Sequence, residues 1–250
     1  MSRLRASVLV LALLTAGIAV RPADGQDSDL VYRAMKVASA DAHVLQISTR
    51  TAAIRVLDSR TWGKTAMTVE EFAAASGAAA VFNGPFFDID GSPMGLLVVD
   101  GKRTQKLRRA DWGVFYVDGS GPHVVHTSEY GTPDGVQQAF QVGPRLVVGG
   151  EVLGLKPQSA RRTALCVQAG GGVLALVTSG SVQASALATW MKEQGCVDAL
   201  NLDGGPSSQM WVKSGSVAVH EPGGTAVPIA VGVFPGQPAS RSEPSGGCGR

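Results

Sequence analysis

The chain has 250 residues, 44% of them hydrophobic and 17% charged, which is enough apolar sequence for one large core or two small ones. Its formal net charge is +2, and it has no lysine- and arginine-rich stripe with interleaved aromatic residues. These properties argue against a nucleic-acid-binding protein.

The N-terminus has the pattern of an export signal. Arg3 and Arg5 precede an apolar run, residues 6–20, that is too short for a comfortable membrane span. Ala23 and Gly25 stand at the −3 and −1 positions of a cleavage site. We therefore expect residues 1–25 to be a signal peptide and the mature protein to be periplasmic or secreted, with an uncleaved anchor as the alternative.

Most of the following sequence predicts short strands. They are apolar or β-branched segments bounded by Gly, Pro or Asp, at residues 54–56, 112–117, 123–126, 162–168, 173–178 and 228–234. Gly149-Gly150 and the glycines at 170–172 are typical of hairpin turns.

Two helices are predicted as well. Thr68-Val69-Glu70-Glu71 is a capping box that begins a helix ending at Gly77. A second helix is expected from about Ser181, as its N-cap, to Gln194, with Gly195 as its C-cap.

Glycine-punctuated strands with few helices predict an α+β fold, a single domain of mixed, largely antiparallel strands over residues 26–235. Residues 236–250 are rich in Gly, Pro and Ser and are predicted to be a disordered tail. Export permits disulfides, and the sequence leaves open whether Cys166 and Cys196 pair and leave Cys248 unpaired.

The most informative stretch is residues 199–211. A short apolar run ends in Asn201 and Asp203, passes the Gly204-Gly205 turn, and restarts through two serines into a second apolar run. Two glycines let main-chain N–H groups approach a ligand closely, and successive N–H groups can form a concave anion site. The alternative is an ordinary β-turn between two strands.

Two further stretches have a similar character. In one, an apolar run again ends in asparagine followed by glycine, at Asn83-Gly84, and continues to Asp88. In the other, Arg162-Thr163 enters a strand just before it becomes apolar. Together the three stretches contain the amides, carboxylate, hydroxyls and guanidinium of a small pocket for an anionic substrate.

These stretches resemble the motifs of the phosphodiester glycosidase family. They are Asn-Gly-x-Phe-Phe-Asp at residues 83–88, Arg-Thr-Ala at 162–164 and Asn-Leu-Asp-Gly-Gly-x-Ser-Ser at 201–208, and the likeness runs from about residue 42 to 234. Pro206 stands where the family usually has a third glycine, and Gln209 where threonine is common. Pro206 also removes one N–H donor from the turn.

The resemblance implies hydrolysis of the anomeric C–O bond of a sugar-1-phosphodiester. Asp203 is the expected base, nucleophile or oxocarbenium stabiliser, and Arg162 the expected phosphate ligand. Asn83, the third catalytic candidate, and Asn201 are expected to bind sugar hydroxyls or to hold Asp203 in place. The substrate-binding candidates are Gly84, Asp88, Thr163, Asn201, Gly204, Gly205, Ser207 and Ser208.

Each of these assignments has a structural alternative. Arg162 could form a strand-end ion pair, Asp203 an Asx cap, and the asparagines could bond their own turns. Glu221 is a reserve carboxylate, and Lys102 a solvent-facing residue within possible reach of a phosphate.

No cofactor is expected. Asp88, Asp90 and Ser92 resemble part of a calcium loop, but the partner glutamate is missing and a hairpin turn is favoured. Zinc is not expected, because the four histidines form no ligand-spaced pair with a carboxylate; they are His43, His123, His126 and His220.

The interpretation is therefore an exported phosphodiester glycosidase whose partner is a sugar-phosphate, glycan or glycolipid, with no nucleic acid and no integral membrane domain after signal cleavage. One alternative is a non-catalytic cell-envelope glycan-binding protein on the same fold. Another is a periplasmic phosphodiesterase cutting P–O, which would normally use a metal cluster.

Overall fold

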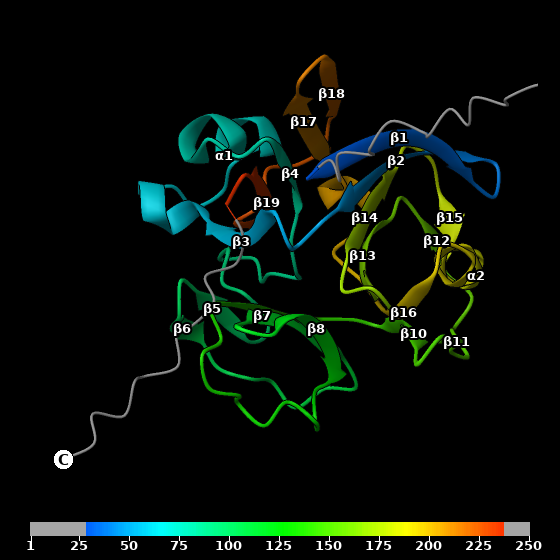
Figure 1. The fold of residues 1–250 in the computed structure, drawn as a ribbon, viewed down its shortest axis with the longest axis horizontal. Coiled ribbons are helices and arrows are strands. Elements are labelled where there is room, and N and C mark those ends of the chain that lie inside the picture. Colours follow the sequence, from blue (N-terminus) through cyan, green and yellow to red (C-terminus); the bar gives the residue numbers. More distant parts are fainter. Residues whose placement is uncertain (1–28, 238–250) are drawn as a thin grey trace, which may run out of the picture.

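Three antiparallel sheets surround a common core in the computed structural model, which describes residues 29–237 (Figure 1). The first sheet has seven strands: β1 (Leu30–Val37), β2 (Ala40–Ile47), β14 (Val173–Thr178), β13 (Thr163–Gln168), β16 (Cys196–Asn201), β10 (Arg145–Val148) and β11 (Glu151–Val152), in this spatial order. A short pair, β12 (Ser159–Ala160) and β15 (Val182–Gln183), lies beside it.

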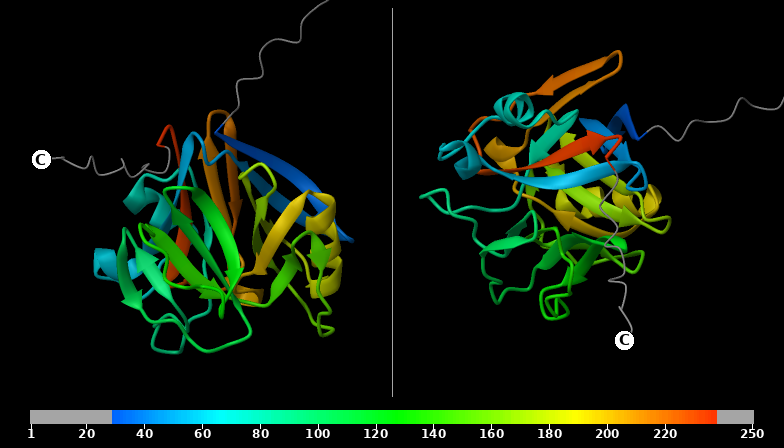
Figure 2. Two further views of the ribbon diagram at one scale, coloured as in Figure 1. Left: turned by 60° about the horizontal axis from the view of Figure 1, so that its bottom comes forward. Right: turned by 60° about the vertical axis from the view of Figure 1, so that its left-hand side comes forward.

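The other two sheets have five strands each. In spatial order, the second contains β18 (Val217–Glu221), β17 (Met210–Ser214), β4 (Ala80–Asn83), β19 (Ile229–Pro235) and β3 (Ala52–Asp58). The third contains β6 (Lys102–Gln105), β5 (Leu97–Val99), β9 (Gln138–Val142), β7 (Gly113–Asp118) and β8 (Gly121–His126). The left view of Figure 2 shows the third sheet from below, in front of the other two.

The core lies between the inner faces of the sheets, where buried residues from all three pack in one cluster, among them Leu45, Phe82, Phe115, Phe140 and Leu165. Two helices cover outer faces. α1 (Val69–Ser76) buries Phe72 and Ala73 against the second sheet, and α2 (Ala184–Glu193) buries Leu187 and Met191 against the first (Figure 1). The α+β label therefore fits only loosely, because the part of the chain that is described is largely β.

The strands that the sequence predicts are present, within one or two residues at most ends, as β3, β7, β8, β13, β14 and β19. Both predicted glycine turns are hairpins, with left-handed backbone at Gly149, Gly150 and Gly171. The capping box of α1 is also confirmed: the Thr68 side chain accepts from the Glu71 N–H at 3.2 Å, and Gly77 ends the helix with φ of 75°.

The predicted start of the second helix is wrong. Ser181 is not its N-cap, because Val182 and Gln183 pair with Ala160 and Ser159 in the short β12–β15 ladder. The helix begins only at Ala184, and Gln183, its N-cap, makes no side-chain capping bond. At the other end the C-cap is Gln194, one residue before the predicted Gly195. A tertiary strand pairing has displaced a local capping signal.

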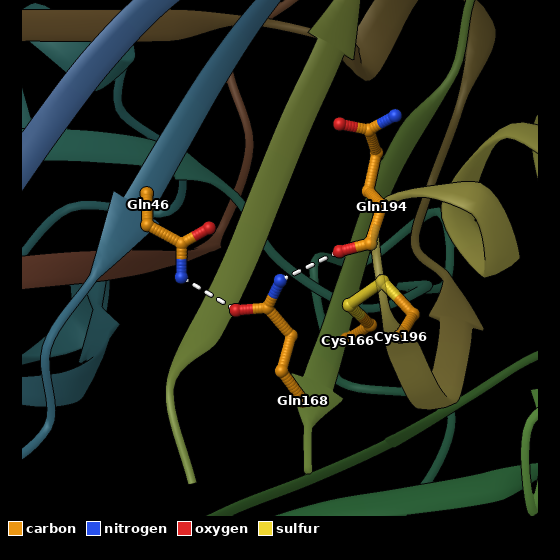
Figure 3. The surroundings of a disulfide bond; sticks show 5 residues. All are labelled: Gln46, Cys166, Gln168, Gln194 and Cys196. Carbon is orange, nitrogen blue, oxygen red and sulfur yellow. Dashed lines mark hydrogen bonds between the residues drawn. A yellow bond between two sulfur atoms is a disulfide. The ribbon is translucent and has the colours of Figure 1, made fainter. Parts of the chain in front are cut away.

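Cys166 and Cys196 form a disulfide, with 5.7 Å between their Cα atoms (Figure 3). It links the neighbouring strands β13 and β16 beneath α2. Close by, Gln168 joins three segments: its Oε1 accepts from Gln46 Nε2 at 2.5 Å and its Nε2 donates to the Gln194 carbonyl at 2.8 Å (Figure 3). The sequence alone had left open whether these two cysteines pair.

Removing the disulfide should destabilise the fold. The bond closes a loop with a sequence separation of 30 residues, and chain entropy alone then predicts a loss of about 3–4 kcal/mol in the free energy of unfolding. Urea titration of the double variant Cys166→Ala/Cys196→Ala against wild type measures this loss. An unchanged unfolding midpoint would mean that the surrounding β-ladder already supplies the constraint.

The predicted signal peptide, most of the predicted tail and Cys248 lie outside the described residues. Within residues 29–237, no helix has both the length and the apolar character needed to cross a membrane.

Candidate active site

The three sequence motifs meet where the first and second sheets adjoin. β4 of the second sheet ends at Asn83, and β13 and β16 of the first sheet begin and end, respectively, at Thr163 and Asn201. The chain leaving β16 is held by both sheets: Leu202 N donates to the Thr163 carbonyl at 2.8 Å and Asp203 N to the Gly84 carbonyl at 3.2 Å. Residues distant in sequence thus converge on Asp203.

Asn83 holds the main chain of Asp203 in place. It is fully buried, and its Nδ2 donates to the Asp203 carbonyl at 2.8 Å. Its Oδ1 accepts from the Thr163 hydroxyl at 2.7 Å and from Gln209 N at 3.2 Å. Thr163 is buried as well. These two candidates therefore bond to each other and to the main chain of the site, which favours the second of the two roles expected for Asn83.

Arg162 is a buried cation with neutral partners. Only 3% of it is exposed, and its guanidinium donates to the carbonyls of Val182, at 3.1 Å, and Gln158. Its Nη1 also donates to Asn201 Oδ1 at 3.4 Å. Burial lowers the pKa of Arg162. Because no carboxylate pairs with it among the described residues, the strand-end ion pair considered as an alternative is absent there.

Asn201 is buried and bonded on both sides. Its Oδ1 receives the Arg162 bond, and its Nδ2 donates to the Leu202 carbonyl at 2.7 Å. Arg162 and Asn201 are therefore buried next to each other at the ends of these strands, and neither side chain is open to solvent.

Asp203 is the partly exposed carboxylate of the group. Its Oδ1 accepts from Gly204 N at 3.0 Å. Burial raises the pKa of Asp203, and the neighbouring Ser207 side chain and the Gly204 N–H partly oppose that rise. A carboxylate whose charged form is desolvated, yet reachable, has the properties of a catalytic base or nucleophile.

The turn after Asp203 requires its glycines. A Cβ on Gly204 would lie 2.9 Å from the Arg161 carbonyl oxygen, and Gly205 has φ of +61°. Gly205 N donates to that same carbonyl at 2.9 Å. Gly84 is similarly confined, since a Cβ there would lie 3.0 Å from the Ile229 carbonyl oxygen. The close approach of main chains at these points explains the glycines without invoking a ligand.

Past the turn, Ser207, Ser208 and Gln209 are buried. Gln209 is fully bonded: its Oε1 accepts from Val69 N at 3.1 Å and its Nε2 donates to the Thr225 carbonyl at 2.9 Å. The Ser208 hydroxyl, in contrast, is buried with no hydrogen-bond partner among the described residues. Gln209 therefore ties the site loop to the start of α1, while Ser208 has an unused donor.

The unused hydroxyl predicts the effect of Ser208→Ala. Removing a buried hydroxyl that bonds nothing should leave the free energy of unfolding unchanged or raise it by up to about 1 kcal/mol. Ser207→Ala is the matched control, and it should cost about 1 kcal/mol because it removes a buried hydroxyl that interacts favourably with the ionised Asp203 carboxylate. Urea titrations of both variants measure this difference; destabilisation of Ser208→Ala equal to that of Ser207→Ala would disprove it.

Asp88 lies apart from this group, on an exposed turn. Its Oδ1 accepts from Ile89 N at 2.9 Å, and Asp88 N donates to the Ser92 carbonyl at 2.8 Å. An antiparallel bridge between Phe87 and Pro93 closes the turn, so the hairpin interpretation of this segment is confirmed. Lys102 is exposed at the start of β6 in the third sheet. Within residues 29–237 no group of three or more His, Cys, Asp or Glu residues is arranged to hold a metal ion.

A polar cluster beside the turn was missed in the sequence, although one of its members, Glu221, was named as a reserve carboxylate. Arg161 Nη2 donates to Glu221 Oε1 at 2.6 Å, and Glu221 Oε2 receives bonds from Ser179 Oγ at 3.0 Å and His43 Nε2 at 3.2 Å. Tyr32 OH lies 2.9 Å from His43 Nδ1. These five residues come from five separate segments of the chain, and no local sequence pattern predicts that they meet.

A sequence profile of the phosphodiester glycosidase family matches residues 76–234, more than half of the chain. The chain belongs to this family. The matched segment contains all three motifs and every candidate site residue. No curated protein matches the sequence.

Solved structures share the fold. The zebrafish N-acetylglucosamine-1-phosphodiester alpha-N-acetylglucosaminidase catalytic domain, auto-inhibited by its pro-peptide, is similar with a TM-score of 0.63 and 16% identity over 83% of each chain. A hypothetical protein from Synechocystis has a TM-score of 0.52 and 16% identity, covering 82% of this chain and 61% of that chain. At this identity the likeness concerns the fold alone.

Proposed function

We propose that this protein is an exported hydrolase that cleaves the anomeric C–O bond of a sugar-1-phosphodiester. The observation that carries the proposal is the position of Asp203: a partly exposed carboxylate at the junction of the three family motifs, with its main chain fixed by the buried Asn83. Export is supported by the signal-like N-terminus and by the Cys166–Cys196 disulfide, which suits an oxidising compartment.

The chemistry asks one carboxylate to act at the anomeric carbon. The leaving group is a phosphate monoester, which is stable as an anion and departs with little protonation, so a dedicated general acid is not required. An ionised Asp203 then either attacks the anomeric carbon, deprotonates the attacking water, or stabilises the oxocarbenium-like transition state. The Gly204 N–H, which donates to this carboxylate, orients it for each of these roles.

Product analysis in heavy-oxygen water tests the proposal. The purified mature protein is incubated with a panel of UDP-sugars and simple sugar-1-phosphodiesters. The products are separated and their masses are measured by mass spectrometry. Hydrolysis at the anomeric carbon places the heavy oxygen on the free sugar. Label in the phosphate instead would mean P–O cleavage and would replace the glycosidase assignment by a phosphodiesterase.

The rival within the same fold is a glycan-binding protein without turnover. It predicts no labelled product from any substrate, together with measurable affinity for a sugar-phosphate that falls when Asp203 is replaced. A titration calorimetry experiment on the same panel separates this outcome from a simple failure to find the substrate.

A further inference from the structure

We infer that Arg161, and not its neighbour Arg162, is the residue that recognises the phosphate of the substrate, and that Glu221 sets how strongly it does so. The inference rests on the proposed function, because it assigns a phosphate group to the ligand of the same site. It extends that function by naming the cation that faces the ligand.

The hydrogen-bond inventory of the two guanidinium groups distinguishes them. Arg162 uses Nε, Nη1 and Nη2 in bonds to protein oxygens and is 3% exposed. Arg161 uses Nε toward the Thr178 carbonyl, at 3.3 Å, and Nη2 toward Glu221 and the Pro222 carbonyl. A guanidinium has five N–H donors, and both Nη1 donors of Arg161 have no partner among the described residues. Its side chain is 25% exposed.

Arg161 also lies against the turn that follows Asp203. Its carbonyl accepts from Gly205 N at 2.9 Å and sits where a Cβ on Gly204 would clash. Its guanidinium contacts the Glu221–Pro222 segment, and that segment leads to Gly224, whose N–H donates to the Pro206 carbonyl at 2.7 Å. The main chain of Arg161 therefore contacts the turn that follows the proposed catalytic carboxylate, and the segment that its guanidinium contacts packs on the same turn.

Alternation explains why consecutive arginines have different surroundings. Successive side chains of an extended segment point to opposite faces. Arg162 points to the carbonyls of residues 158 and 182, whereas Arg161 points to β18 and the end of β14. A phosphate ligand needs a charged donor that it can reach, and only the second arrangement leaves one.

Glu221 both orients Arg161 and weakens its field. Its Oε1 receives the Arg161 bond at 2.6 Å, while Oε2 is occupied by Ser179 and His43. With the His43 proton assigned to Nε2, Nδ1 accepts from Tyr32 and every member of the cluster is bonded. The carboxylate thus fixes the guanidinium geometry and cancels part of its charge toward an incoming anion.

Binding of inorganic phosphate, measured by titration calorimetry at low ionic strength, tests this assignment without requiring turnover. Wild type should bind phosphate, and Arg161→Met should weaken the affinity by about 10–100-fold, because a charge-assisted bond is lost. Lys192→Met is the matched control. It too removes the cation of an ion pair with a glutamate, Glu151, but it lies on α2, and it should change the affinity less than about twofold. Thermal melts check that each variant is folded.

Glu221→Gln separates charge from structure. Glutamine keeps an oxygen acceptor for Arg161 but removes the negative charge, so phosphate should bind up to about fivefold more tightly. A purely structural role for Glu221 predicts the opposite, a weaker affinity. Weaker binding in this variant, no phosphate binding by wild type, or unchanged binding in Arg161→Met would each overturn the inference.

The outcome is separable from that of the proposed function. Arg161-dependent phosphate binding without hydrolysis of any sugar-phosphodiester would sustain the inference and remove the enzymatic proposal. Hydrolysis that survives Arg161→Met with an unchanged KM would do the reverse.

Discussion

Asp203→Asn should lower kcat on a sugar-1-phosphodiester by about 10²–10⁴-fold, with KM changed only a few-fold. The amide keeps the size of the side chain and an oxygen that accepts from Gly204 N, so the turn is preserved. What is lost is the negative charge and basicity that act at the anomeric carbon. Steady-state kinetics on the substrate found by product analysis measure the two constants separately.

The same residue predicts the acid limb of the pH profile. Burial raises the pKa of Asp203 above its ordinary value, and the carboxylate must be ionised to act. Activity should therefore fall, as pH decreases, at a higher pH than for an ordinary aspartate. A kcat/KM profile of wild type, taken at constant ionic strength, locates this limb.

Stability supplies an independent check with a definite sign. Because the folded-state pKa is raised, the folded protein binds more protons than the unfolded chain between the ordinary and the raised value, and stability falls as pH rises through that window. The Asp203→Asn variant has no carboxyl group at this position, so it does not lose stability in this way as pH rises. The stability of the variant relative to wild type should therefore increase as pH rises from below the ordinary aspartate pKa to neutrality, as expected of a site strained for function.

Asp111→Asn is the matched control, since its carboxylate is 95% exposed and makes a surface contact with His126. It should leave kcat and the pH dependence of stability unchanged. If Asp203→Asn behaves like Asp111→Asn in both measurements, Asp203 is a turn-capping residue, the alternative that the sequence had left open.

How far the sequence predicts this site depends on how local each signal is. The Asn201–Gly205 stretch can be recognised in the sequence because its polar residues interrupt apolar strands. The α1 capping box can be recognised because it is complete within four residues. The predicted start of α2 was wrong. Serine is a favourable N-cap residue, but the residues after Ser181 pair in the β12–β15 ladder and the helix begins after them. Arg162 illustrates a different limit. The direction of its side chain depends on how distant strands pair, and no single segment of the sequence encodes that pairing.

Residues that meet only through tertiary structure were the least predictable. The contact between His43 on β2 and Glu221 on β18 spans 178 positions, and neither residue stands in a pattern that implies the other. Asn83 shows the intermediate case. Its motif marks it as a site candidate. The hydrogen-bond partners that favour holding Asp203 over binding a sugar all lie at least 80 residues away in the sequence.

Those partners make Asn83→Ala the most destabilising of the single substitutions considered. It deletes three hydrogen bonds, two of them buried and one partly buried, and leaves the Asp203 carbonyl, the Thr163 hydroxyl and Gln209 N without those partners. Unpaired buried groups of this kind should cost about 3–5 kcal/mol in the free energy of unfolding. Urea titration measures the loss, and activity, where enough protein folds, should fall because Asp203 is displaced.

Thr163→Val separates scaffold from substrate contact at the same place. It removes only the 2.7 Å bond to Asn83 Oδ1, which keeps its bond from Gln209 N, so the expected cost is about 1 kcal/mol. A scaffold predicts this graded order of stabilities, with Asn83→Ala far below Thr163→Val. An Asn83→Ala protein as stable as wild type but inactive would show instead that the amide faces the sugar, and the main chain of Asp203 would then need another explanation for its fixed position.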